Sequence, residues 1–137
     1  MRSIAASIVL IVLTAALAAC STSAGGALTG KAWQWTASTT KLPASQSVVP
    51  DPQSYTTEFK SDNTYAGKPN CNQIAGGYQT SGANGLTITP GPSTLAFCGE
   101  QSLDTIYVQG LAKAKSDAVA NGQLTITLTD DGTMTFK

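Results

Sequence analysis

Hydrophobic and polar residues alternate along most of the chain after residue 30, as in β-strands that bury one face. Trp33 and Trp35 are separated by a polar residue and therefore share a strand face. The same alternation predicts four further strands, each with one shared face. The residues on these faces are Tyr55, Thr57 and Phe59; Tyr78 and Thr80; Leu86 and Ile88; and Leu124, Ile126 and Leu128. Turn residues at 61–63, 81–85, 121–122 and 130–132 separate strands, and the Asn-Gly pair at 121–122 is typical of a type I′ hairpin. The pattern predicts a chain of antiparallel hairpins.

One segment has helical rather than strand spacing. Its apolar stripe, at intervals of three and four, comprises Leu103, Ile106, Tyr107, Gly110, Leu111 and Ala114. The polar positions predicted to face outward are Ser102, Asp104, Gln109 and Lys113. We therefore predict an α+β fold in which one helix packs on a mostly antiparallel, strongly curved sheet or open β-barrel. The indoles of Trp33 and Trp35 would fill its core, or alternatively line a binding groove.

Proline and glycine mark the predicted loops. Pro43, Pro50 and Pro52 interrupt residues 38–52, so we expect a surface loop there with no regular element. Residues 67–78 hold the densest run of Gly, Pro and Asn and are predicted to cross the end of the sheet as a tight loop. The sequence Pro-Gly-Pro at 90–92 is expected to end the strand that contains Ile88.

Composition narrows the possible functions. The 137 residues contain 8 basic and 8 acidic side chains and no histidine. The balanced charge gives no basic surface for nucleic acid, and the commonest general base and metal ligand are both missing. No set of residues has metal-ligand or cofactor-binding spacing. We therefore expect a single-domain monomer without metal or cofactor.

The N-terminus has the features of an export signal. Arg2 precedes a short apolar run that ends in small residues and is too short for a membrane-spanning helix. The tetrapeptide at 17–20, Leu-Ala-Ala-Cys, resembles the lipobox of bacterial lipoproteins. That resemblance implies a signal peptide at 1–19, acylation of Cys20 with chains such as palmitate, and a flexible tether at 20–30 before a folded domain at 31–137. The protein would then be exported and held on the membrane of the cell envelope. A secreted protein without lipid, or a disulfide-bonded Cys20, is the alternative.

The other two cysteines form an even pair once Cys20 is assigned to lipid. An exported protein meets an oxidising compartment, so we expect a disulfide between Cys71 and Cys98. A buried pair of free thiols and a redox site are the alternatives.

Taken in order, these residues resemble the META domain, the family of the heat-shock lipoprotein HslJ. The resemblance rests on the two tryptophans, Phe59, Cys71 with Asn72, the Gly-Gly-Tyr at 76–78, the segment from Thr94 to Cys98, and the final hairpin ending in Phe136. Asn70 departs from the glycine usual before the first cysteine. The resemblance implies a compact barrel-like α+β domain on an envelope lipoprotein linked to stress response or antibiotic tolerance. It implies no common reaction.

The remaining candidate chemistry lies near the cysteine pair. If the disulfide forms, Glu100 would lie close to Asn70, Asn72 and Lys68. These residues would form a polar binding cluster or would only brace the loop, with Asn72 bonded to its own backbone as asparagine is in turns. We favour a non-enzymatic binding protein whose partner is an envelope protein or an apolar or cell-wall ligand. The binding surface would be the barrel mouth, including Trp33 and Trp35, together with residues 38–52. A small envelope hydrolase or inhibitor-like effector that uses Glu100 and Asn72 is the alternative.

Overall fold

The computed structural model describes residues 27–137. The predicted signal peptide at 1–19, Cys20 and most of the predicted tether lie outside the described residues. Within the described part, no helix is long and apolar enough to cross a membrane.

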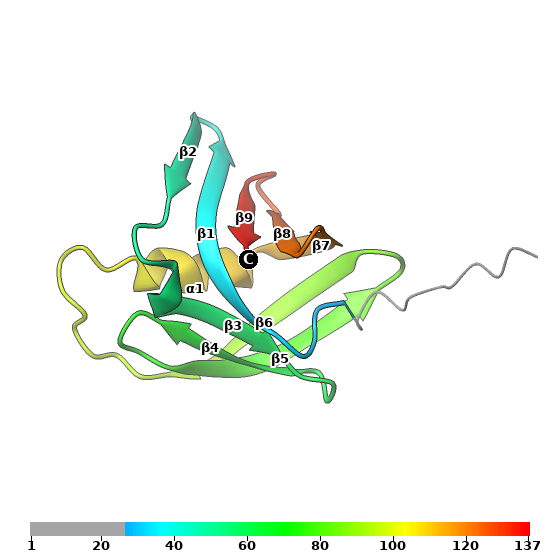
Figure 1. The fold of residues 1–137 in the computed structure, drawn as a ribbon, viewed down its shortest axis with the longest axis horizontal. Coiled ribbons are helices and arrows are strands. Elements are labelled where there is room, and N and C mark those ends of the chain that lie inside the picture. Colours follow the sequence, from blue (N-terminus) through cyan, green and yellow to red (C-terminus); the bar gives the residue numbers. More distant parts are fainter. Residues whose placement is uncertain (1–26) are drawn as a thin grey trace, which may run out of the picture.

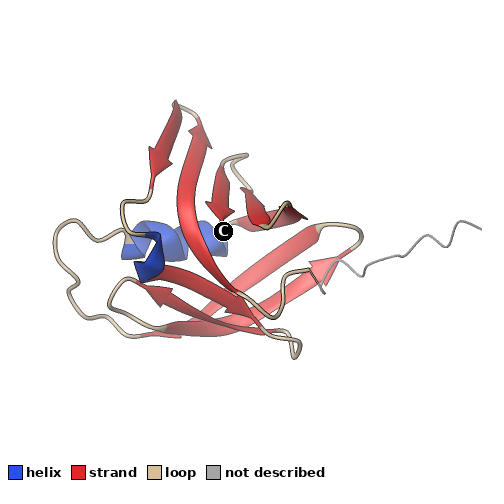
Figure 2. Ribbon diagram, viewed as in Figure 1, coloured by secondary structure: helices blue, strands red, loops and turns tan. Residues whose placement is uncertain are grey.

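The described chain consists mainly of β-strands, with one α-helix and one short 3-10 helix (Figures 1 and 2). In chain order the elements are β1 (Ala32–Lys41), β2 (Ala44–Val48), η1 (Pro52–Ser54), β3 (Tyr55–Phe59), β4 (Thr64–Pro69), β5 (Ile74–Ser81), β6 (Gly85–Ser93), α1 (Asp104–Ala112), β7 (Ala114–Ala120), β8 (Gln123–Leu128) and β9 (Thr133–Phe136).

All strands pair antiparallel in the order β2-β1-β3-β4-β5-β6-β7-β8-β9, and β9 pairs again with β1. The long strand β1 is shared: its first half pairs with β3 through Trp33 and Thr57, whereas its second half pairs with β2. Between β6 and β7 the only registered pair is Gly85 with Ser116. The expected curved antiparallel sheet with a single helix is confirmed.

The core lies on the inner face of this sheet, under α1. Trp33 and Trp35 are each 2% exposed, which confirms that they fill the core. The Trp35 ring centroid lies 5.6 Å from that of Tyr55 and 5.4 Å from that of Tyr107 on α1. Tyr107 and Leu111 are the buried residues of the helix. An added Cβ at Gly110 would lie 2.5 Å from the sulfur of Met134, so the helix packs closely at its glycine.

The helix differs from its prediction at its C-terminal end and in the width of its apolar stripe. It ends at Ala112, so Ala114 belongs to β7 rather than to the helical stripe. Ile106 was predicted to face the core but is 57% exposed. The stripe predicted from spacing is therefore too wide for a helix of nine residues that contacts the sheet mainly through Tyr107 and Leu111.

The prediction of a structureless loop at 38–52 is wrong. β1 continues to Lys41 and turns through residues 42–43 into β2, with Ala37 paired to Val48 and Lys41 to Ala44. The prolines do not prevent this hairpin, because Pro43 lies in the turn and Pro50 follows the strand, where neither must donate a hydrogen bond to the ladder.

Two other predicted loops are also largely strand. In residues 67–78, β4 runs to Pro69 and β5 starts at Ile74, which leaves a turn of four residues. β6 continues through the Pro-Gly-Pro segment to Ser93, with a register shift in its pairing with β5. Gly76 is required there because an added Cβ would lie 2.3 Å from the carbonyl oxygen of Thr89. The glycines therefore allow close strand packing rather than a loop.

Candidate functional site

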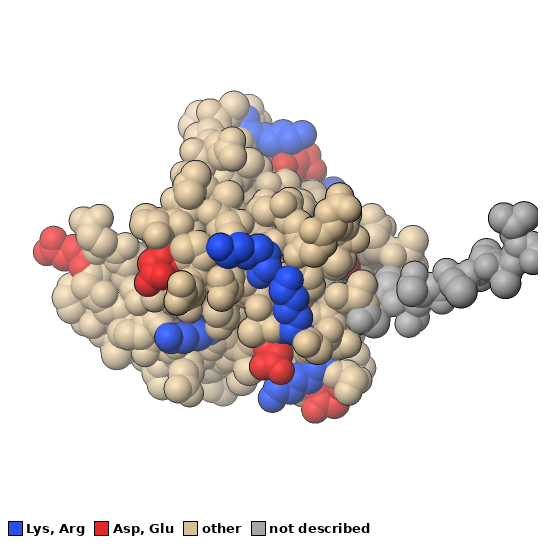
Figure 3. All heavy atoms as spheres, in the orientation of Figure 1, with Lys and Arg blue, Asp and Glu red and all other residues tan. Residues whose placement is uncertain are grey.

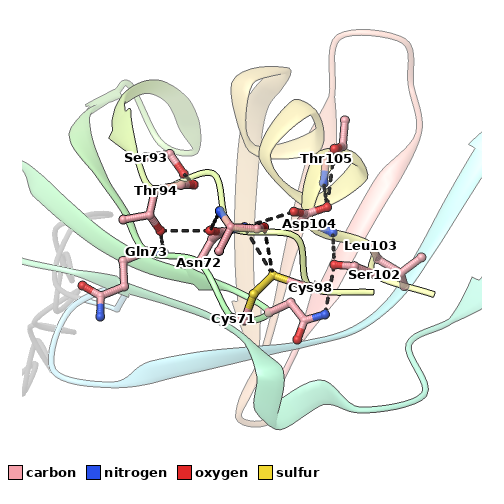
Figure 4. The surroundings of a disulfide bond; sticks show 12 residues. Cys71, Asn72, Gln73, Ser93, Thr94, Cys98, Ser102, Leu103, Asp104 and Thr105 are labelled. Carbon is pink, nitrogen blue, oxygen red and sulfur yellow. Dashed lines mark hydrogen bonds between the residues drawn. A yellow bond between two sulfur atoms is a disulfide. The ribbon is translucent and has the colours of Figure 1, made fainter. Parts of the chain in front are cut away.

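The turn between β4 and β5 carries Cys71 and Asn72, and both hold the segment that follows β6. Cys71 forms a disulfide with Cys98, with their Cα atoms 5.6 Å apart. Asn72 is only 3% exposed. Its Oδ1 accepts hydrogen bonds from the backbone N–H of Ala96 at 2.8 Å and from the hydroxyl of Thr94 at 3.0 Å. Figure 4 shows Asn72 between Thr94 on one side and the start of α1 on the other.

The amide nitrogen of Asn72 makes the complementary contacts. It donates to the carbonyl oxygen of Ala96 at 3.0 Å and lies 3.2 Å from Oδ2 of Asp104. Asn72 thus binds both backbone groups of Ala96, as a neighbouring strand would. The segment of residues 94–98, which we call the disulfide loop, is fixed by this side chain and the disulfide. Its large apolar side chains, Leu95 and Phe97, are 92% and 83% exposed.

Asn70 connects the same turn to a different part of the molecule. Its backbone N–H donates to the carbonyl oxygen of Ser54 at 2.7 Å, and its side-chain amide donates to the hydroxyl of Ser102 at 2.9 Å. Its φ of 59° is in the left-handed region that asparagine tolerates better than most residues. Asn70 therefore holds together the segment that follows β2 and the segment that leads into α1.

A groove of about 500 Å³ lies between these two segments, and we call it the β2 groove. Its residues come from the end of β2, from η1 and the start of β3, from Asn70, and from the chain that leads from the disulfide into α1. They are Ser47, Val48, Pro50, Asp51, Ser54, Tyr55, Asn70, Cys98, Gly99, Glu100, Gln101, Ser102 and Leu103. Among these lining residues, the backbone N–H of Leu103 donates to the partly buried hydroxyl of Tyr55 at 2.8 Å.

The β2 groove carries negative charge. Asp51 and Glu100 line it, and none of the described lining residues is lysine or arginine. Asp51 Oδ2 accepts a hydrogen bond from the Ser54 hydroxyl at 2.5 Å. In Figure 3, acidic side chains lie at the left of the molecule, and a basic side chain lies below them, over β4.

The structure divides the predicted polar cluster among three places. Asn70 and Glu100 line the β2 groove. Asn72 lines a smaller cleft of about 200 Å³ between the disulfide loop and α1. Lys68 lies in a shallow groove of about 610 Å³ on the outer faces of β3, β4 and β5, together with Glu58. Glu100 and Asn72 therefore do not meet, and the contacts of Asn72 are internal to the fold.

The predicted orientation of Asp104 is also wrong. Its carboxylate does not point freely to solvent but accepts hydrogen bonds from Asn72 and from the backbone N–H of Thr105, the latter at 2.7 Å. A carboxylate in the first turn also interacts favourably with the helix dipole.

The interior of the sheet holds a further group of polar atoms. The hydroxyls of Thr57 and Tyr107 form a buried hydrogen bond. The Tyr65 hydroxyl is buried without a hydrogen-bond partner. Burial raises the pKa of Tyr65 to about 12 and also raises that of Tyr107. These phenols stay protonated at neutral pH and act in the packing of the core.

Two features of this site were missed from the sequence. The β2 strand and Asp51 were assigned to a structureless loop, and the exposure of Leu95 and Phe97 has no signal in the alternating pattern. Within residues 27–137, no three His, Cys, Asp or Glu side chains are placed to hold a metal ion. The arrangement presents an acidic groove next to a fixed loop whose large apolar side chains are exposed.

Comparisons with known proteins give the fold and the family. Two solved structures share the fold: an NMR structure of a protein from Burkholderia xenovorans (19% identity, TM-score 0.65, 83% of this chain and 85% of that chain covered) and a crystal structure of a DUF4847 family protein from Bacteroides vulgatus (13% identity, TM-score 0.60, 80% and 92% covered). No curated protein sequence matches the chain significantly. The sequence profile of the META domain matches residues 26–137, which include every described residue. This chain belongs to the META domain family.

Proposed function

We propose that the protein is an exported lipoprotein of the bacterial cell envelope whose META domain binds a protein partner without catalysing a reaction. The observation that carries the binding role is the β2 groove, which combines exposed Val48 with the carboxylates of Asp51 and Glu100. The anchor is proposed from the lipobox-like tetrapeptide that ends at Cys20. The complex would serve stress response or antibiotic tolerance, as the family resemblance implies.

The chemistry of the groove favours binding over catalysis. A hydrolase needs a nucleophile, a base within hydrogen-bond reach and a group that orients the base. In the groove, the Ser54 hydroxyl donates to Asp51 at the start of η1, where it closes a local turn. No described third group orients this pair. Glu100, the base of the alternative hydrolase hypothesis, is exposed and separated from Asn72.

Site-specific photo-cross-linking in the native envelope tests the binding role. A photoreactive amino acid at Val48, which is 74% exposed in the groove, should give a reproducible cross-linked protein. The matched control is the same group at Gln79, an exposed residue of β5 outside the groove. The proposal fails if the two positions give the same products or if Val48 gives none.

Metabolic labelling with an alkyne analogue of palmitate tests the anchor. The wild-type protein should be labelled and recovered with membranes, whereas Cys20→Ser should be neither. Equal labelling and membrane recovery of the two proteins would refute lipidation of Cys20. A deletion strain complemented with either protein then reports whether tolerance of envelope stress requires the anchor.

A further inference from the structure

Strand β2 has a free edge in a sheet whose other strands are paired on both sides. It pairs with β1 alone, whereas every other described strand has two or more neighbours in the sheet. Figure 1 shows β2 at the outside of the sheet with no strand beside its outer edge. In an antiparallel pair, alternate residues turn their N–H and C=O away from the partner. β2 therefore offers unpaired backbone donors and acceptors to any added strand.

This edge has little protection against pairing. All five residues of β2 are exposed, and the strand, Ala-Ser-Gln-Ser-Val, contains no charge, proline or bulge. Charged side chains, prolines and bulges are the usual devices that prevent edge pairing. Pro43 and Pro50 lie outside the strand and delimit the accessible edge to its five residues.

The β2 groove continues from this edge, since Ser47 and Val48 line it. A strand added to β2 would therefore lie between two parts of the molecule. β2 would be on one side, and Cys98 with the segment leading into α1 would be on the other. The groove supplies the carboxylates of Asp51 and Glu100, and no described lining residue supplies a cation. Charge complementarity thus requires positive side chains on the added strand.

We propose that the partner binds by β-strand addition: an extended, basic polypeptide segment pairs with the free edge of β2 and places lysine or arginine near Asp51 and Glu100. The proposal rests on the proposed binding function and specifies its partner. Main-chain hydrogen bonds would supply affinity, and the carboxylates would select the charge of the segment. A second copy of this chain fits less well, because β2 carries no basic residue to meet the two carboxylates.

Synthetic peptides test the pairing directly. The probe is the acetylated, amidated octapeptide Lys-Thr-Lys-Val-Lys-Thr-Lys-Val, added to the full-length ¹⁵N-labelled protein in detergent micelles. It should shift the amide resonances of residues 44–48 and slow their hydrogen exchange. The same peptide with every backbone nitrogen methylated can donate a hydrogen bond from neither of its edges and should bind at least about tenfold more weakly.

Charge is tested with a second peptide and with matched variants. Replacing every lysine of the probe by glutamate should abolish binding. Glu100→Gln should weaken the lysine peptide about threefold, as expected for an exposed ion pair, whereas Glu58→Gln on the outer face of β3 should not. Glu100 is exposed and has no hydrogen bond or ion pair among residues 27–137, so this variant should keep the wild-type unfolding midpoint.

Three results would overturn the inference. They are binding of the methylated or glutamate peptide as tight as that of the lysine peptide, amide shifts confined to other strands, and slowed exchange of β2 that depends only on protein concentration. The last result would indicate pairing between two copies. If Val48 cross-links a partner but the peptides fail to bind, strand addition is wrong while the binding function stands. If the lysine peptide binds but Val48 cross-links no protein, β2 can accept an added strand and the proposed binding function is wrong.

Discussion

Replacing Asn72 by aspartate should destabilise the fold through the side chain that fixes the disulfide loop. The change keeps the shape and the acceptor Oδ1, which serves Ala96 and Thr94. It removes the NH₂ group that donates to Ala96 and lies near Asp104. Each lost hydrogen bond costs about 1 kcal/mol net. The second oxygen would then face a carbonyl oxygen and a carboxylate.

The repulsion adds to that loss. Two unit charges about 3 Å apart repel by roughly 5 kcal/mol at an effective dielectric constant of about 20, and partial exposure of Asp104 reduces this figure. Uptake of a proton limits the cost at pH 7 to about 4 kcal/mol, from about 3 pKa units at 1.36 kcal/mol each. If screening at the partly exposed Asp104 leaves about 2 kcal/mol of repulsion and the lost hydrogen bond to Ala96 costs about 1 kcal/mol, the total loss is about 3 kcal/mol, which lowers Tm by about 13 °C in a domain of this size.

The loss should depend on pH. Repulsion raises the folded-state pKa of the introduced carboxyl above its unfolded value, so the penalty is present at neutral pH and disappears as pH falls below about 4. Urea unfolding of Asn72→Asp and Asn72→Ala at pH 7 and pH 3.5 measures this difference. Gln79→Glu, an exposed amide-to-carboxylate change on β5, is the matched control.

Asp104→Asn provides a second check, because it should restore part of the stability of Asn72→Asp and little of that of Asn72→Ala. The electrostatic reasoning is refuted if the aspartate and alanine variants lose the same stability at both pH values. If both variants stay within about 0.5 kcal/mol of wild type, Asn72 does not fix the loop at all.

Three further substitutions test the core and the sheet by urea or thermal unfolding. Tyr107→Phe should cost about 1–3 kcal/mol, because it leaves the buried Thr57 hydroxyl without its partner, and adding Thr57→Val should recover most of the loss. Gly76→Ala should destabilise by more than about 2 kcal/mol, because its Cβ would lie 2.3 Å from the Thr89 carbonyl oxygen. Burial raises the pKa of Asp117, whose Oδ1 has no hydrogen-bond partner, so wild-type stability should fall as pH rises from its unfolded pKa through its higher folded pKa. Asp117→Asn should remove that dependence and be the more stable protein at pH 7; equal pH profiles would contradict the assignment.

The strand faces were predictable because large apolar side chains at every second position leave one face to bury. Trp33 and Trp35 follow this rule, as do the residues of β8. The turn at Asn121 and Gly122 was predictable for a local reason as well. Its φ angles of 53° and 75° are both positive, as a type I′ turn requires, and this residue pair adopts them readily.

The extent of β2, β4 and β6 was not predictable, because proline and glycine were interpreted as ends of strands. Whether Pro43 ends a strand depends on whether its backbone lies in the ladder or in the turn, which only the pairing decides. Similarly, Gly67 has room only for a hydrogen, since an added Cβ would lie 2.9 Å from Cγ2 of Ile74. A single sequence does not identify such a neighbour on the adjacent strand.

Asn70 and Glu100 do share the β2 groove, but the grouping of Asn72 with them failed for a related reason. Residues two apart in a turn can point to different sides, and here Asn70 reaches Ser102 whereas Asn72 reaches Ala96. Proximity to the disulfide in sequence was therefore a poor guide to shared chemistry. Asp51 lines the groove because β2 forms and the segment after this strand lies opposite residues 98–103.

The position of the groove relative to the start of the described chain bears on what can reach it. Leu28 is buried, and its carbonyl oxygen accepts the indole N–H of Trp33 at 2.8 Å, which fixes the start of the domain. Figure 1 places this start and the loop that contains residues 98–103 at opposite ends of the long axis. Leu28 follows Cys20 by eight positions, so the chain between them spans at most about 28 Å. A lipid on Cys20 would therefore hold the start of the domain near the membrane and leave the groove accessible from the opposite end. This geometry favours a partner that arrives from the aqueous side, and a photoreactive group at Val48 that labels lipid instead of protein would refute it.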